Sequence, residues 1–151
     1  MRIQQLSELL DYVVSCRIEM AKLYGRLHAQ ADSSRVKLML ENFQQHEREA
    51  AEKLENYIDD APKRVLDTWY KDIVFEDFIA RCQKLNLPGN MTEEDVLEQH
   101  LVLDNLLIDL IEKTAGSSAT QETKGALEDL VREKRIQQQR LVHSSIRMDD
   151  I

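Results

Sequence analysis

Four charged side chains stand on or beside helical apolar stripes, at places where an apolar residue is the rule. They are Arg17, Glu47, Asp104 and Lys134. Charges that a helix turns toward a core have two uses. Carboxylates can hold hard metal cations, and opposite charges can satisfy one another. Because these four charges sum to zero, we predict a buried network of salt bridges and hydrogen bonds, which Gln137 and the Tyr24 hydroxyl complete.

The rotational register of the first and last stripes decides which of these chemistries applies. A shift of one residue puts Glu19 and Glu133 inward in place of Met20 and Lys134. The inward side chains are then four carboxylates: Glu19, Glu47, Asp104 and Glu133. Such a set suits a pair of hard cations, even without histidine. The apolar stripe favours the register with Met20 inward, and therefore the charge network without a metal.

The other side chains that could bind a metal or take part in redox chemistry are the histidines and the cysteines. The histidines are His28, His46, His100 and His143. They lie at different heights along their helices, and within the predicted helices only His100 forms an i, i+4 pair with a carboxylate, Asp104. We therefore expect solvated or rim histidines and no shared metal site. Cys16 and Cys82 have no motif spacing, so we expect two reduced thiols, with Cys16 in the core.

Apolar side chains at helical spacing predict the elements that position these groups. The four predicted helices cover residues 3–31, 33–58, 92–115 and 119–148. Asp32-Ser33-Ser34 breaks the first pattern and supplies an N-cap for the second helix. Thr92 begins the third helix, with acidic residues in its first turn. Gly116-Ser117-Ser118 forms the turn before the fourth helix.

The link between the second and third helices, residues 62–90, is too long and too apolar to be structureless. We predict one or two short helices in it, lying across the bundle. Its aromatic side chains are expected to pack onto the bundle, with a partner-binding patch as the alternative. They are Trp69, Tyr70, Phe75 and Phe78.

The order of these helices and the lengths of their connections predict an all-α fold. Two tight helix hairpins joined by a long crossover are typical of a ferritin-like four-helix bundle, whereas an up-down bundle needs only a short second loop. Residues 1–151 suit a single domain with one core. The sequence has only four glycines and two prolines, so it offers few of the turns that would separate short strands.

Composition also excludes several classes of function. A net charge of −8 argues against non-specific binding to nucleic acid or to an anionic membrane. No apolar run reaches the length of a membrane span, and the opening residues lack the apolar stretch of a secretory signal. There is no Gly-rich phosphate loop and no Ser-His-Asp candidate. We expect a soluble protein of the cytoplasm.

Two segments resemble rubrerythrin-like and bacterioferritin-like members of the ferritin-like superfamily. The segment Arg17-Ile18-Glu19-Met20-Ala21-Lys22-Leu23-Tyr24 is similar to the first-helix pattern Glu-x6-Tyr. The segment from Phe43 to Leu54 is similar to the second-helix pattern around Glu-x-x-His. The resemblance implies a di-metal site with a lone Glu on two helices and Glu-x-x-His on the other two.

The ligand positions that this resemblance implies hold mostly other residues here. In chain order they are Arg17, Glu47, Ala50, Asp104, Lys134 and Gln137. Glu47 keeps the family's residue and Asp104 keeps a carboxylate, but the other four ligands are replaced and both histidines are gone. Two of the replacements are cations, which repel a metal.

The resemblance leaves three functions of different classes open. The first, which we expect, is a non-catalytic ferritin-like protein without a cofactor, acting through an unknown protein partner or through self-assembly, for example as a homodimer. The second is a di-iron or di-manganese oxidase, peroxidase or iron-handling protein, with Glu47 and Asp104 as ligands and Tyr24 as a nearby donor. The third is a simple helical adaptor.

Overall fold

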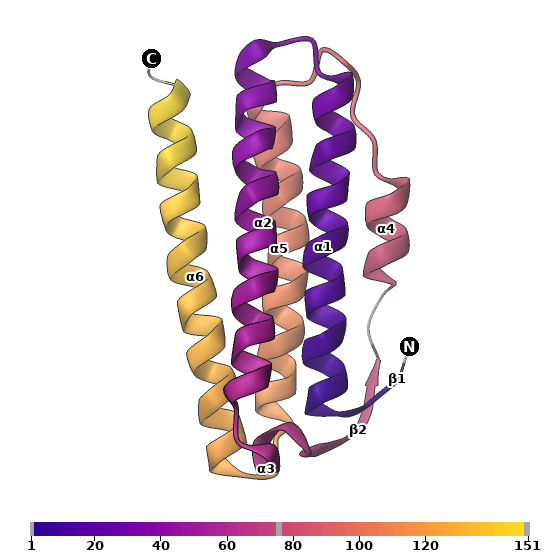
Figure 1. Cartoon of the computed structure of the whole chain (residues 1–151), viewed down its shortest axis with the longest axis vertical. Coiled ribbons are helices and arrows are strands. Elements are labelled where there is room, and N and C mark those ends of the chain that lie inside the picture. Colours follow the sequence, from indigo (N-terminus) through magenta and orange to yellow (C-terminus); the bar gives the residue numbers. More distant parts are fainter. Residues whose placement is uncertain (1, 75–76, 150–151) are drawn as a thin grey trace. The chain divides into compact units, whose positions relative to one another are not determined.

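The computed structural model describes residues 2–74 and 77–149 (Figure 1). Its six helices and two strands fall into two compact units, Met1–Thr92 and Glu93–Ile151. Each unit contains one pair of long helices. The four long helices that the sequence predicts are therefore confirmed.

The first unit is built on the hairpin of α1 (Leu6–Gln30) and α2 (Ser34–Asp60). The predicted N-cap is confirmed, because the Ser33 side chain accepts a hydrogen bond from the Val36 backbone N–H at 3.4 Å. The helices approach closely at Gly25, where an added Cβ would lie 2.8 Å from Gln44 Nε2. Gln44 Nε2 instead donates to the Ala21 carbonyl of α1 at 3.1 Å, which ties the two helices together.

The crossover contains two short helices, as predicted, and also a strand. These elements are α3 (Lys63–Leu66), β2 (Trp69–Val74) and α4 (Phe78–Lys84). Strand β2 pairs antiparallel with β1 (Arg2–Gln5), with Ile3 opposite Ile73 and a register shift between Ile3 and Gln5. The prediction that the first helix begins at residue 3 is therefore wrong. Aromatic and β-branched residues in β2 favour a strand. Because residues 2–5 pair with this strand, they are extended and the first helix begins only at Leu6.

The crossover aromatics divide between core and surface. Tyr70 and Phe78 are buried, as expected, at 6% and 4% exposure. Trp69 is 65% exposed, so the expectation that it packs inward is wrong. It precedes the buried Tyr70, and successive side chains of a strand point to opposite faces. Phe75 lies outside the described residues.

The second unit is the hairpin of α5 (Glu93–Gly116) and α6 (Gln121–Asp149). Within its turn, the Ser118 hydroxyl donates to the Thr114 carbonyl at 2.9 Å, and Thr120 Oγ1 accepts from the Thr123 backbone N–H at 3.2 Å. An exposed ion pair joins the helices further along, with Arg135 Nη2 2.6 Å from Glu112 Oε2. Among the helices described in both units, none combines the length and the apolar character needed to cross a bilayer.

Candidate functional site

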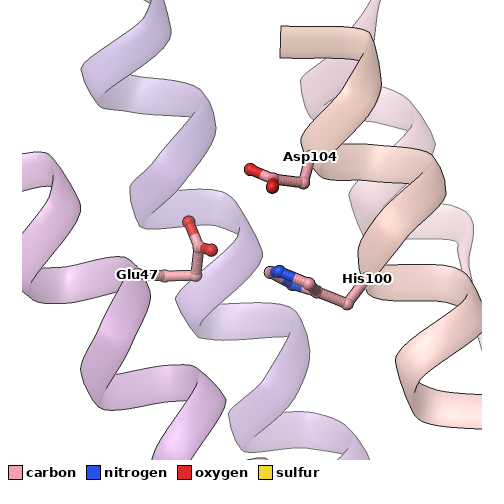
Figure 2. Close-up of side chains that lie close together, drawn as sticks. All are labelled: Glu47, His100 and Asp104. Atoms are coloured by element: carbon pink, nitrogen blue, oxygen red, sulfur yellow. The ribbon is translucent and has the colours of Figure 1, made fainter. Parts of the chain in front are cut away.

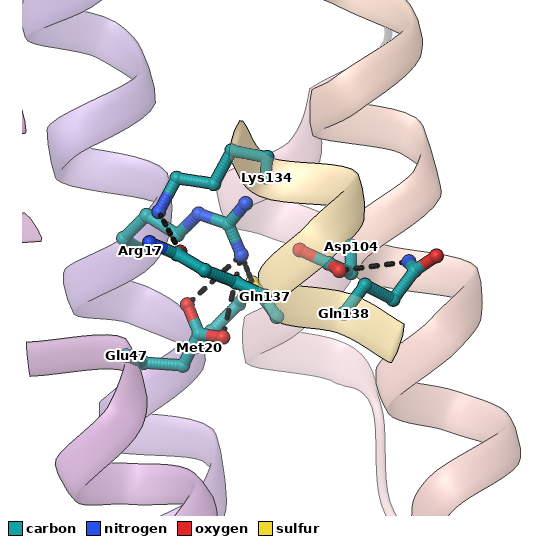
Figure 3. A network of polar contacts seen from close by, with 7 residues as sticks. All are labelled: Arg17, Met20, Glu47, Asp104, Lys134, Gln137 and Gln138. Carbon is teal, nitrogen blue, oxygen red and sulfur yellow. Dashed lines mark hydrogen bonds and ion pairs between the residues drawn. The ribbon is translucent and has the colours of Figure 1, made fainter. Parts of the chain in front are cut away.

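The most deeply buried charges of the first hairpin form an ion pair. Arg17 of α1 and Glu47 of α2 point toward each other, and Arg17 Nη1 lies 3.1 Å from Glu47 Oε2 and 3.3 Å from Oε1 (Figure 3). The two residues are 3% and 0% exposed. The same Arg17 nitrogen lies 3.9 Å from the Met20 sulfur, one turn along α1.

Helical spacing explains why these two charges meet. Arg17 and Met20 share one face of α1, and Met20 is fully buried. Glu47 lies on the α2 face that also buries Phe43 and Ala50. Taken singly, either charge would carry a large desolvation cost, but the contact pairs them and leaves no net charge.

Tyr24 lies in the same hairpin, two turns along α1 from Arg17. It is 1% exposed, and its ring meets Phe43 of α2 edge-on, with centroids 5.9 Å apart and planes at 68°. This is the favoured geometry for an aromatic pair. Tyr24 therefore helps to fix the α1–α2 spacing beside the ion pair.

On α5, His100 and Asp104 project from the same side of the helix, one turn apart (Figure 2). They are 1% and 5% exposed. The expectation of solvated or rim histidines is therefore wrong for His100, although His28 and His46 are partly exposed and His143 is exposed. The signal was present in the sequence: His100 lies on the apolar stripe of its helix, four residues before a carboxylate.

Two glutamines of α6 hold the polar groups of the second hairpin. Gln138 Nε2 donates to Asp104 Oδ2 at 2.8 Å and to Asn105 Oδ1 at 2.9 Å, which fixes the orientation of the Asp104 carboxylate (Figure 3). Sequence reasoning missed Gln138. Gln137, which it singled out, accepts instead from Lys134 Nζ of the same helix at 3.2 Å. Lys134 and Gln137 are both half-buried.

The four carboxylates of the alternative register differ in burial: Glu47 and Asp104 are buried, Glu19 is partly buried and Glu133 is exposed. Glu19 is 15% exposed, and its carboxylate lies 3.4 Å from the ammonium of Lys22, which is 64% exposed. The neighbouring positions are more buried, with Met20 at 0% and Lys134 half-buried.

Each unit also holds buried side chains of types that suit a metal ion. Glu47 of α2 offers a carboxylate, and α5 offers the His100 imidazole and the Asp104 carboxylate (Figure 2). One nitrogen and a few carboxylate oxygens are ligands that iron and manganese accept. A ferritin-like pair of metals takes more: four carboxylates and two histidines from four helices.

Comparison with known proteins identifies the fold. No protein-family model matches the sequence, and none of the curated proteins matches it. Among solved structures, the chain is similar to a protein from Thermotoga maritima described as a ferritin-like diiron-carboxylate protein. The TM-score is 0.55 at 16% identity, and the match covers 93% of this chain and 94% of that chain. At this identity the likeness shows the fold, an all-α ferritin-like four-helix bundle.

Proposed function

We propose that this chain is a non-catalytic ferritin-like protein in which built-in charges take the place of a di-metal centre. The buried ion pair between Arg17 and Glu47 carries the proposal. Ferritin-like di-metal proteins turn carboxylates inward to bind and neutralise two cations. In this chain the guanidinium of Arg17 already neutralises one such carboxylate.

Electrostatics favours the ion pair over a bound metal at Glu47. A cation that took the Glu47 carboxylate would have to displace Arg17 Nη1 from its contacts at 3.1 and 3.3 Å. The guanidinium would then be buried without its partner, at a cost of roughly 3–5 kcal/mol. The incoming dication would also face the positive charge of Arg17 in a region of low dielectric.

We extend the proposal to the polar residues of α5 and α6. Within the second hairpin, Lys134 balances the charge of Asp104, as Arg17 balances Glu47 within the first. Gln137 completes the hydrogen bonding of Lys134, and Tyr24 that of the first hairpin. Two facts support this: the partial burial of Lys134 and the burial of Asp104 at 5% exposure.

The available donors do not fit a di-metal centre. The buried carboxylates and the buried imidazole in the described parts of the chain are those of Glu47, Asp104 and His100, and Arg17 contacts the first of them. A single metal ion is the second candidate, favoured by the burial of His100 one turn before Asp104. That would make the chain an iron- or manganese-binding protein with unusual ligands.

Metal analysis after reconstitution separates these functions. The purified protein is incubated anaerobically with Fe(II) or Mn(II), desalted and measured by elemental analysis. We expect less than about one tenth of a metal ion per chain, because Arg17 competes for Glu47. About two ions per chain would overturn the proposal. About one ion, lost in H100A and D104N, would establish the second candidate.

Without a cofactor the protein has to act through contacts, so we propose that it assembles with itself or with a protein partner in the cytoplasm. A homodimer is the simplest closed assembly. Sedimentation velocity over a range of concentrations tests self-assembly, and a single species with the mass of two chains is expected. A chain that stays monomeric at every concentration would contradict self-assembly.

A further inference from the structure

Helix α6 carries an exposed row of side chains whose charge changes from acidic to basic along the helix. The row lies on one face of an unbroken helix, because its residues follow one another at alternating spacings of four and three (Figure 1). Its members, which we call the α6 stripe, are all exposed: Asp129, Glu133, Ile136, Arg140 and His143. At its centre the Ile136 side chain is 45% exposed, so an apolar group meets solvent between the two charged ends.

The whole of α6 shows the same change of charge. Residues 121–133 include four acidic and two basic residues, whereas residues 134–145 include three basic residues and no acidic one. The helix macrodipole favours this order only within the first and last turns of a helix. Glu133 and Arg140 lie near the middle of α6 (Gln121–Asp149), so the macrodipole does not account for their positions.

Contacts within α6 leave the charges of the stripe available to a partner. Glu133 and Arg140 lie seven residues apart, about 10 Å along the helix axis, so they do not reach each other within one chain. Glu133 Oε1 accepts from Gln137 Nε2 at 3.5 Å, and Asp129 Oδ1 lies 2.8 Å from Arg132 Nη1 in an exposed pair. Exposed contacts of this kind contribute little and are readily exchanged for others.

The α6 stripe is complementary to its own reverse. Glu133 lies three residues before Ile136, and Arg140 lies four residues after it. A twofold axis at Ile136 between two antiparallel copies of α6 therefore places Glu133 of each copy beside Arg140 of the other, to within the 1.5 Å rise of one residue. Asp129 and His143, seven residues before and after Ile136, come opposite each other in the same way. A parallel arrangement would set like charges side by side, which is unfavourable.

We propose that two copies of this chain dimerise through the α6 stripe, with their α6 helices antiparallel. This inference rests on the self-assembly proposed above and names the surface that carries it. The two Ile136 side chains lose contact with water at the axis, and each charge pair occurs twice because of the symmetry. The apolar centre supplies attraction, whereas the charges fix direction and register. The stripe covers only about four turns, less than a permanent interface, so the dimer should dissociate at high dilution.

Charge reversal in the full-length protein tests the contact. Glu133→Arg should raise the dissociation constant of the dimer about tenfold, because two arginines then face each other at two places. Arg140→Glu should weaken the dimer to a similar extent. The double variant E133R/R140E restores opposite charges and should return the dissociation constant to within about threefold of the wild-type value. Sedimentation velocity over a dilution series measures these constants, and circular dichroism checks that each variant is folded.

Glu128→Arg is the matched control for Glu133→Arg. It makes the same change of charge at an exposed position of α6, about 100° around the helix from Asp129. We expect its dissociation constant to stay within about twofold of the wild-type value. A loss of dimerisation equal to that of E133R would overturn the assignment, and so would a double variant that recovers no affinity.

A cysteine at position 136 tests the twofold axis itself. Under mild oxidation with diamide, Ile136→Cys should give a dimer linked by a disulfide that reduction splits, whereas Glu128→Cys should give little. The native cysteines, Cys16 and Cys82, are 0% exposed, so the wild-type chain should not cross-link. Equal cross-linking of I136C and E128C would contradict the antiparallel register.

These outcomes separate the α6 contact from the proposed function. A dimer that survives both E133R and R140E would overturn the α6 contact and leave self-assembly standing. A wild-type chain that is monomeric at every concentration would contradict both, and the stripe would then be a solvated surface or a site for another protein. Neither result touches the Arg17–Glu47 ion pair, which metal analysis tests separately.

Discussion

Arg17 and Glu47 lie thirty residues apart in the chain and meet as a buried ion pair, with Arg17 Nη1 3.1 Å from Glu47 Oε2. Each stands on the inner face of its helix, where most neighbours are apolar. The pair thus places a cation against the one residue that matches the ferritin-like second-helix ligand. Under the proposed function, this pairing keeps a metal cation from the Glu47 carboxylate.

Removing one member of the pair should be strongly destabilising. We expect Arg17→Met to lower the free energy of unfolding by roughly 3–5 kcal/mol, because Glu47 is left buried without its partner. Urea unfolding followed by circular dichroism measures this. The matched control is Arg132→Met, whose exposed pair with Asp129 has side chains 67% and 71% exposed. It should cost less than about 1 kcal/mol.

The combined variant R17M/E47Q should be less destabilised than the sum of the two single variants. In the double variant no charge is left unpaired, so the coupling energy of the cycle measures the ion pair itself. Additive losses of stability would mean that the two side chains do not interact in solution.

Lys134→Met should cost less than Arg17→Met. Lys134 is half-buried and its ammonium donates to Gln137 at 3.2 Å on the same helix. We expect a loss of about 1 kcal/mol from the broken hydrogen bond and the lost charge balance. Thermal unfolding provides the measurement, and an unchanged midpoint would remove Lys134 from the network.

Two helical glycines should respond differently to alanine. Gly125→Ala in α6 has no heavy atom within 4 Å of its new Cβ, so it should stabilise the chain by about 1 kcal/mol. Gly25→Ala has the same propensity gain but meets Gln44 Nε2 at 2.8 Å and displaces its hydrogen bond to Ala21. We expect little or no net stabilisation there. Equal gains in urea midpoint for the two variants would argue against the close approach of α1 and α2.

Stability should fall on the alkaline side. Folding raises the pKa of the Cys16 and Cys82 thiols from about 8.5 to about 12, because burial disfavours the thiolates. The native state therefore holds these protons more tightly. The resulting stability is fully present below about pH 8.5 and is lost as the pH rises toward 12. Burial also raises the pKa of Tyr12, which acts in the same direction.

Unfolding free energies at pH 8 to 10 measure this loss, with a slope of at most about 1.4 kcal/mol per pH unit for each thiol. Cys16→Ala should reduce the slope of unfolding free energy against pH by the contribution of one thiol. This reduction is expected whatever the substitution does to the stability at pH 7. A wild-type profile that stays flat to pH 10 would show that the thiols are hydrated in solution.

Helical periodicity was sufficient to predict the four long helices, since each carries an apolar stripe over many turns. It also indicated Arg17 and Glu47, because a charge that interrupts such a stripe faces the same way as its apolar neighbours. The pairing of β1 with β2 could not be predicted this way. Short strands distant in the chain are selected by their partners rather than by a local period.

Long polar side chains were harder to place from the sequence. Gln138, next to the predicted Gln137, is the residue that reaches Asp104, and a rotation of about 100° between neighbouring helical positions separates the two.

Crystals of the protein soaked in Mn(II) at neutral pH give the most direct test of the central claim, through the anomalous scattering of manganese. We predict no anomalous peak next to Glu47 and an Arg17 guanidinium still in contact with its carboxylate. A manganese peak bound by Glu47, with Arg17 swung away, would contradict the account.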